Sequence, residues 1–228
     1  MAKVNLQRRA EIGREKSART RGQLIAAAHS LFARQAIESI TVDDVVKEAG
    51  VAKGTFYVHF ADLSALTAAA ADELVGTFDD LLQPGRLSLD DPVLRIAFAC
   101  NGFIEKALEE PSWGIVVARM ARSVASVGKV ARRRLLEDLR GVAKETPQGP
   151  TPISPQLGQE IVLGIMLQLL SAFGEGRLSS RDREGAIGAI LRAMGVSGQR
   201  VRSTLARLAR MEPLTHDRPE RGQAAAAR

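Results

Sequence analysis

Hydrophobic residues recur at helical spacing along almost the whole chain, and no segment of useful length alternates hydrophobic and polar residues as a strand does. Near the N-terminus, four hydrophobic residues share one face of a helix that we predict from about residue 19 to residue 34. These residues are Leu24, Ala28, Leu31 and Phe32. The pattern therefore predicts an all-α protein.

Two short helices are expected next, because the sequence marks their ends. Thr41 and Asp44 have the spacing of a capping box, in which each side chain accepts a hydrogen bond from the backbone N–H of the other residue. Gly50 stands where a helix commonly ends in a left-handed residue. We therefore predict one helix over residues 41–49, a tight turn, and a second helix over residues 52–59.

Seven further helices are predicted beyond residue 60. Asp62 can cap the first of them, and Asp91 followed by Pro92 can begin the second. Ser112 can cap the third of these helices. The expected ranges are 62–82, 92–111, 113–126, 127–144, 156–175, 182–194 and 198–211.

The breaks between these helices predict the domain organisation. Pro84 and Gly85 interrupt the chain, and we place the domain boundary there. The expected parts are a basic N-terminal arm at 1–17, a helix-turn-helix domain at 18–66 with a connecting helix to about 82, a larger helical domain at 84–211, and a disordered tail at 212–228.

The third helix is expected to expose groups that suit phosphate oxygens. If Phe56 and Phe60 pack against the first helix, the remaining positions of the third helix point outward. Those positions are Lys53, Gly54, Thr55, Tyr57 and His59. A glycine costs a helix about 1 kcal/mol relative to alanine, and close approach of a DNA backbone is one reason to keep it.

The segment ITVDDVVKEAGVAKGTFYVHFADLSAL, residues 40–66, closely resembles the helix-turn-helix of TetR/AcrR-type regulators. The shared pattern is Thr before the second helix, Ala-Gly-Val at the turn, and then Gly-Thr-Phe-Tyr and His-Phe. The resemblance is strong over about residues 18–66, and beyond them only the number and layout of helices match. It implies a compact three-helix DNA-binding domain followed by a larger helical ligand-binding and dimerisation domain.

The resemblance also implies which residues meet DNA. Tyr57 and His59 would bind phosphates, while Lys53 and Thr55 would lie near base edges or phosphates. The full set expected to contact DNA is Arg21, Thr41, Lys53, Gly54, Thr55, Tyr57 and His59. The implied partner is double-stranded DNA with a pseudo-palindromic operator.

Two positions depart from the family pattern. Ala52 stands where the third helix often begins with a capping Ser, and the fourth helix lacks the Lys that often reaches phosphate. Basic residues between Arg8 and Arg19 could compensate by reaching a groove or the DNA backbone, as homeodomain arms do. Whether this arm and the Arg-rich tail contact DNA stays open at this point.

The larger domain is expected to form a homodimer. By the resemblance, helices 156–175 and 182–194 would build a four-helix bundle with the same helices of a second copy, and Gly164 would allow close approach. A strongly apolar helix needs more than one partner, which supports this interpretation. The alternative is that both helices belong to the core of a single protomer.

A small-molecule effector is also implied, and its identity does not follow from the sequence. Large aromatic side chains often line apolar pockets. The candidates for ligand binding are therefore Phe98, Phe103, Trp113 and Phe173, although each of them, taken separately, is more often an ordinary core residue.

Composition excludes several classes of site and protein. The formal net charge of +6 fits a polyanionic partner, and Cys100 alone permits neither an intrachain disulfide nor a cysteine-based zinc cluster. We find no metal-ligand spacing around the three histidines, no nucleophile elbow and no P-loop, so we expect no metal, no cofactor and no enzyme activity. The N-terminus has no signal-peptide pattern, and we expect a cytoplasmic protein without a membrane span.

These observations predict a sequence-specific DNA-binding transcription regulator, in which a small effector releases a dimeric repressor from its operator. The alternatives are a ligand-independent DNA-binding or architectural protein, and an activator with the same fold.

Overall fold

The computed structural model describes residues 2–123, 128–145 and 153–211, and within these ranges the chain is helical and contains no strand. The all-α class predicted from the sequence is therefore confirmed. The predicted disordered tail, residues 212–228, lies outside the described residues. The elements are α1 (Ala2–Arg34), η1 (Ile37–Ser39), α2 (Val42–Ala49), α3 (Lys53–His59), α4 (Leu63–Leu87), α5 (Pro92–Glu109), α6 (Pro111–Ser123), α7 (Lys129–Glu145), α8 (Pro155–Gly174), η2 (Ser180–Asp182), α9 (Arg183–Ala193) and α10 (Gly198–Leu208).

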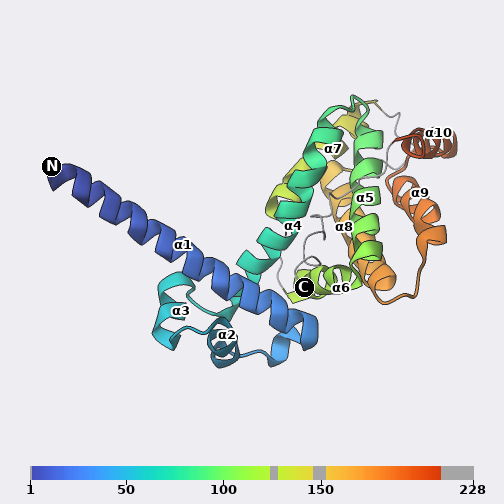
Figure 1. The fold of residues 1–228 in the computed structure, drawn as a ribbon. Helices are drawn as coiled ribbons and strands as arrows, with labels where there is room; N and C mark the ends of the chain where they lie inside the picture. Colours follow the sequence, from blue (N-terminus) through green and yellow to red (C-terminus); the bar gives the residue numbers. More distant parts are fainter. Residues whose placement is uncertain (1, 124–127, 146–152, 212–228) are drawn as a thin grey trace, which may run out of the picture.

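The N-terminal body consists of the second half of α1 together with α2, α3 and the start of α4 (Figure 1). Its core side chains come from all four helices and exclude water almost completely. They include Leu24, Phe32, Val45, Phe56 and Leu66, each 0% exposed. Burial of these large apolar side chains, worth roughly 1.5–3 kcal/mol each, fixes the short α2 and α3 against α1.

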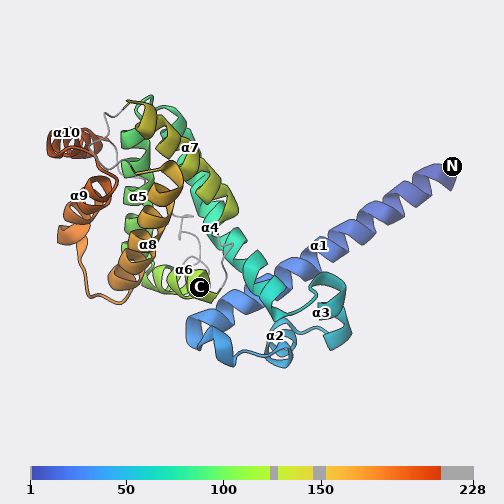
Figure 2. The ribbon, with the colours of Figure 1, turned by 180° about the vertical axis from the view of Figure 1, so that it is seen from behind.

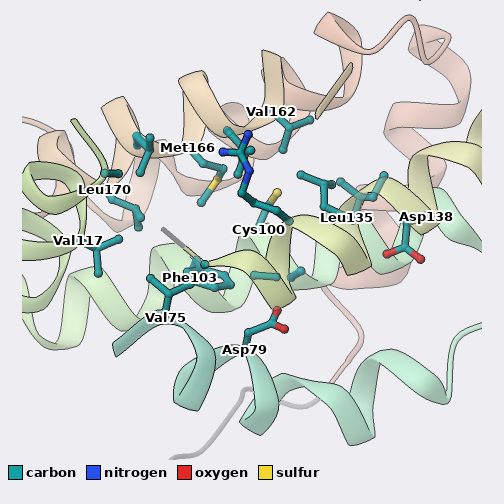
Figure 3. Close-up of a pocket in the computed structure, with 18 of the residues that line it drawn as sticks. Val75, Asp79, Cys100, Phe103, Val117, Leu135, Asp138, Val162, Met166 and Leu170 are labelled. Atoms are coloured by element: carbon teal, nitrogen blue, oxygen red, sulfur yellow. The ribbon is translucent and has the colours of Figure 1, made fainter. Parts of the chain in front are cut away.

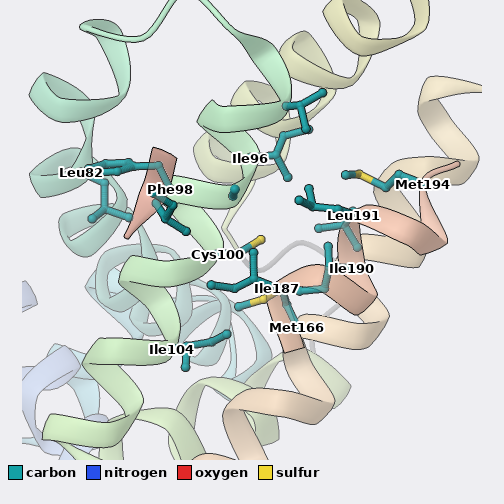
Figure 4. Packing of buried hydrophobic residues seen from close by; sticks show 14 of the residues in the cluster. Leu82, Ile96, Phe98, Cys100, Ile104, Met166, Ile187, Ile190, Leu191 and Met194 are labelled. Atoms are coloured by element: carbon teal, nitrogen blue, oxygen red, sulfur yellow. The ribbon is translucent and has the colours of Figure 1, made fainter. Parts of the chain in front are cut away.

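The larger body consists of the second half of α4 together with α5 to α10, as Figures 1 and 2 show from opposite sides. Helix α5 contacts α4, α6, α7, α8, α9 and α10. Helix α8 contacts α5, α6, α7 and α9. Figure 4 shows one part of this core, in which Ile96, Cys100 and Ile104 of α5 face Ile187 and Leu191 of α9.

Helix α6 contributes to the cores of both bodies. Val116 and Met120 belong to the core of the N-terminal body, whereas Trp113 and Val117 belong to the core of the larger body. Because one helix carries side chains of both cores, a displacement of α6 would disturb the packing of both bodies.

Two helices are longer than the sequence predicted. Helix α1 begins at Ala2 rather than near residue 19, since its Arg, Lys, Glu and Ala residues favour helix and extend a turn that packing has already formed. Helix α4 continues through Pro84 to Leu87. Its last turn is held by the buried side chain of Arg86, which pairs with Asp138, so the predicted break at Pro84 was wrong.

The start of α6 also differs from the prediction. Helix α6 begins at Pro111, and Ser112 is its second residue rather than its cap. Pro at the first helical position has no N–H to satisfy and a φ angle that already suits a helix.

Helices α6 and α8 approach each other at the level of the backbone. A Cβ atom added to Gly114 would lie 2.8 Å from the carbonyl oxygen of Leu170, and one added to Gly174 would lie 2.6 Å from the carbonyl oxygen of Pro111. Both distances are far below van der Waals contact, so this approach requires glycine at both positions.

Replacing Gly114 with Ala should therefore lower the free energy of unfolding by about 1–3 kcal/mol, the usual cost of overpacking a core. Chemical denaturation followed by circular dichroism measures the change. Gly76→Ala is the matched control, because an added Cβ at this α4 position meets nothing within 4 Å. The control should be neutral or more stable by up to about 1 kcal/mol; equal unfolding curves for the two variants would contradict the prediction.

Candidate nucleic-acid interface and internal cavity

The turn between α2 and α3 is built from local hydrogen bonds that the sequence encodes. The side chain of Thr41 accepts a hydrogen bond from the backbone N–H of Asp44 at 3.2 Å, and the carboxylate of Asp44 accepts one from the backbone N–H of Thr41 at 2.9 Å. Gly50 ends α2 with a φ of 66°, in the left-handed region. Both the capping box and the glycine turn are thus confirmed, and they direct α3 away from α2.

One side of α3 is packed and the other is open to solvent. Phe56 is fully buried and holds the helix to the core. Tyr57 is 54% exposed, and its ring lies edge-on to that of Phe56 at a centroid distance of 5.3 Å. Lys53 and Gly54 are also exposed, and an added Cβ at Gly54 would meet nothing within 4 Å.

The other predicted contact residues take different positions. Thr55 and His59 are half-buried on α3, and Thr41 is exposed at the cap of α2. The guanidinium of Arg21 stacks over the ring of Phe60, the residue that ends α3, at 5.1 Å. The structure therefore gathers five of the seven predicted residues on α3, with Arg21 beside its C-terminal end.

Sequence reasoning missed Val58. This side chain is 78% exposed on α3, between Tyr57 and His59. An exposed valine gives no chemical signal in a sequence, and only the orientation of α3 reveals it.

Lys53 is paired within the protein. Its ammonium lies 2.9 Å from a carboxylate oxygen of Asp43, and this hydrogen bond raises the pKa of Lys53. Both side chains are well exposed, and such surface pairs are usually worth no more than about 1 kcal/mol. A phosphate can therefore replace Asp43 at small cost.

A cavity of about 130 Å³ lies among α4, α5, α6, α7 and α8. Most of its wall is aliphatic, and Figure 3 shows Val117, Met166 and Leu170 at one end with Phe103 and Val75.

Charged residues close the other end of this cavity. Arg86, 5% exposed, donates to Asp138 from Nη2 at 2.5 Å and from Nε at 3.2 Å. Arg95 donates to the second carboxylate oxygen of Asp138 at 2.7 Å. Asp79 is paired with Arg134. Because each buried carboxylate has an arginine partner, this end is a fixed structural element of the wall, and removal of one partner would leave a buried charge uncompensated.

Comparison with known proteins supports the interpretation of the N-terminal body. Residues 24–70 match the family model described as bacterial regulatory proteins, tetR family. The similarity to this family is thus found in the N-terminal body. The match covers the buried half of α1, the turn and the start of α4.

Two curated regulators match this chain over the same region. The uncharacterized HTH-type transcriptional regulator YvdT of Bacillus subtilis is 33% identical over 69 residues, covering 30% of this chain and 35% of its own length. The HTH-type transcriptional regulator TtgR of Pseudomonas putida is 35% identical over 68 residues, covering 30% of this chain and 32% of its own. The matched part thus spans about a third of these relatives.

Solved structures resemble a much larger part of the chain. A putative tetR family regulator from Shewanella has a TM-score of 0.64 at 20% identity and covers 76% of this chain and 97% of its own. RolR, crystallised without ligand, has a TM-score of 0.60 at 22% identity, and the match covers 82% of this chain and 96% of RolR. FadR from Bacillus subtilis, in complex with stearoyl-CoA, has a TM-score of 0.59 at 18% identity, and the match covers 77% of this chain and 97% of FadR. These likenesses establish a common fold for both bodies.

Of the four aromatic residues proposed for the ligand site, Phe103 lines the cavity. Phe98 instead packs over Gly85, where an added Cβ would lie 2.6 Å from its ring. Trp113 packs against Phe103 at a centroid distance of 5.9 Å, and Phe173 is 2% exposed in the core. Phe98, Trp113 and Phe173 are therefore not among the residues that line the cavity.

The residues that sequence reasoning missed follow a helical period. Val162, Met166 and Leu170 recur every four residues and place one face of α8 against the cavity. Cys100 lines the cavity from α5, and burial raises the pKa of its thiol to about 12, so this side chain remains a neutral thiol. The four-residue spacing in the sequence could have identified this apolar face of α8, but it could not have identified the cavity beside it.

The capping box gives a prediction for stability. Thr41→Ala removes the hydroxyl that accepts from the N–H of Asp44 and should lower the free energy of unfolding by about 0.5–2 kcal/mol, whereas Thr41→Ser should preserve it. The hydrogen bond from the Thr41 side chain lowers the pKa of Asp44 from 3.8. The ionised carboxylate of Asp44 therefore contributes its full stabilisation above pH 3.8, and this stabilisation is lost as the pH falls through the lower pKa that Asp44 has in the folded state. Unfolding curves at pH 7 and at decreasing pH should show the Thr41→Ala deficit shrink in acid; a constant deficit would contradict this role of Asp44.

Proposed function

We propose that the chain is a sequence-specific DNA-binding transcription regulator, which acts as a dimeric repressor and leaves its operator when a small molecule binds. The observation that carries this proposal is the exposed face of α3, where Lys53, Gly54 and Tyr57 face solvent on a helix that a capping box and a glycine turn help to position. In a helix-turn-helix protein, such a helix lies in the major groove.

Each group on this face has a suitable DNA counterpart. The ammonium of Lys53 can exchange Asp43 for a phosphate or a guanine edge, and the hydroxyl of Tyr57 can donate to a phosphate. Gly54 allows the DNA backbone to approach closely. Val58 can contact the methyl group of a thymine, which is the apolar feature of the major groove.

Dimerisation through α8 and α9 is supported by the exposure of α8. This helix is long and apolar enough to cross a membrane by composition, yet only 39% of its most apolar window is buried. Leu157 is 54% exposed, and an added Cβ at Gly164 meets nothing within 4 Å. Figure 2 shows α8 on the outer side of its body, where a second copy can cover it. Two copies would then present two α3 helices to the half-sites of an inverted repeat.

The cavity is the proposed effector site. Its volume of about 130 Å³ is close to the roughly 150 Å³ of an apolar protein cavity that holds benzene. We therefore expect a small, mainly apolar effector the size of one ring. The crystal structures of RolR with resorcinol and of FadR with stearoyl-CoA support ligand binding by proteins of this fold.

Helix α6 can transmit effector binding to DNA. Val117 and Ala121 line the cavity, while Val116 and Met120 are part of the N-terminal core. An effector that shifts α6 would change the orientation of the N-terminal body and so the spacing of two α3 helices in a dimer. A coupling free energy of about 1–3 kcal/mol would change operator affinity 5- to 150-fold, provided that the effector binds one arrangement better than the other.

Selection from random duplex DNA at near-physiological salt tests the DNA-binding proposal. We expect an inverted repeat with half-sites about one helical turn apart. Lys53→Ala and Tyr57→Phe should weaken binding to that sequence, while Arg210→Gln, an exposed change on the last turn of the larger body, should not. Recovery of unrelated sequences, or of single half-sites bound by a monomer, would reject the dimeric sequence-specific regulator.

Filling the cavity tests the effector proposal. Ala99→Leu places a larger side chain in the cavity wall and should abolish the thermal stabilisation that small aromatic probes such as indole or toluene give the wild-type protein. Operator affinity without a probe should remain unchanged. Ala206→Leu, an exposed change on α10, is the matched control and should respond to probes as the wild type does. Equal responses of Ala99→Leu and wild type would show that the probes bind elsewhere.

A further inference from the structure

The first half of α1 projects from the protein as a free-standing helix. Every residue from Glu11 to Arg19 is exposed, and the first buried residue of this helix is Leu24. At 1.5 Å per residue, the 19 residues before Arg21 extend the helix by roughly 28 Å. Figures 1 and 2 show this part reaching past α3, away from the larger body.

The projecting helix carries a strong excess of positive charge. Between Arg8 and Arg21 the chain has six basic residues and two acidic ones. Within the described chain, no ion pair joins Arg14, Lys16 or Arg19 to an acidic side chain. These cations are therefore available to a partner, unlike the arginines that close the cavity.

From Glu11 to Arg19 the helix also lacks the apolar stripe that a lipid surface or a partner helix requires. In the exposed stretch from Glu11 to Arg19, Ile12 is the single large apolar residue, at 56% exposed. A membrane-surface helix or a coiled coil would require a continuous apolar face. The surface is thus complementary to a polyanion rather than to lipid chains or to another amphipathic helix.

The position of the helix relative to α3 indicates which polyanion it meets. Arg21 stacks over Phe60 at the end of α3, and Arg14 lies two helical turns earlier on the same face, since seven residues return a helix to almost the same direction. Arg14 therefore continues the surface of Arg21 outward from the end of α3, the helix proposed to bind the major groove. Lys16 and Arg19 lie on the opposite side of the helix, about 200° and 140° around its axis from Arg14 at roughly 100° per residue.

We propose that the projecting half of α1 is a second DNA-binding element that lies along a groove of the duplex flanking each half-site. Arg14 on one side of the helix, and Lys16 and Arg19 on the other, then bind phosphates of the two strands. This inference rests on the proposed function of α3 and extends it, because it predicts a DNA footprint longer than the bases that α3 contacts. The reach of roughly 28 Å corresponds to about 8 base pairs at 3.4 Å per step.

The test compares wild type with the triple variant Arg14→Gln/Lys16→Gln/Arg19→Gln in the full chain. Glutamine has a helix propensity close to that of arginine and lysine, so the helix should persist. Two duplexes are used, the selected operator with blunt ends and the same operator extended by 10 base pairs on each side. The wild type should bind the extended duplex more tightly, and the triple variant should bind both equally.

Salt dependence gives a second readout. Each phosphate contact contributes about 0.9 to the slope of log affinity against log salt, so the loss of three contacts from each protomer of the proposed dimer should take roughly 5.4 from this slope on the extended duplex. Between 50 and 200 mM salt, wild-type affinity should then fall about 1,800-fold more than that of the variant. The control variant Arg140→Gln/Arg202→Gln/Arg210→Gln removes the same charge from exposed positions of the larger body and should keep the wild-type slope.

The outcomes separate this inference from the function of α3. If wild type binds the operator specifically but shares the salt slope and duplex preference of the triple variant, the second DNA-binding element is rejected and the proposed function stands. Loss of binding to phosphatidylglycerol vesicles in the triple variant, with DNA binding unchanged, would also reject it and assign the helix to a membrane surface. If wild type shows no sequence-specific binding, both proposals fail.

Discussion

The packing of α6 into two cores is the constraint on which the rest of the structure depends. Met120 is fully buried in the N-terminal core, and Val117 is buried one turn earlier in the core that surrounds the cavity. Since Gly114 also brings the backbone of α6 against α8, the helix cannot slide past α8 without a clash. Protein cores are too closely packed to deform continuously, so such a helix favours a small number of discrete positions.

The fixed charges at the end of the cavity define what can shift α6. Arg86, Arg95 and Asp138 satisfy one another across α4, α5 and α7, and this network resists displacement. The opposite end is aliphatic and is formed by α6 and α8, through Val117 and Leu170. A ligand that occupied the cavity, as proposed above, would therefore act on its apolar end, which is the end attached to the N-terminal body.

Local signals in the sequence predicted the N-terminal body well. Thr41, Asp44 and Gly50 act on residues within four positions of themselves, so their effects on α2 and α3 require no knowledge of the rest of the fold. Pro84 shows the opposite case. Its local preference is to end a helix, but Arg86 is held by Asp138, 52 residues further along the chain, and this tertiary contact overrides the preference. The residues that line the cavity could not be predicted from local signals either. Phe98 and Phe103 have the same side chain, and they differ only in the direction in which α5 orients them.

The free-standing half of α1 is a case in which local effects act without tertiary packing. Residues 11–19 have no packing to lose and remain helical through propensity and through their continuity with the packed turns from Leu24 onward. A flexible arm of the same charge would lose more conformational entropy on binding a phosphate backbone than a preformed helix does. The helix holds its cations at fixed spacing and in a fixed direction from Arg21, which lies against α3. Its charges are thus prearranged relative to the helix proposed to read the operator, and they can add affinity without altering which bases that helix contacts.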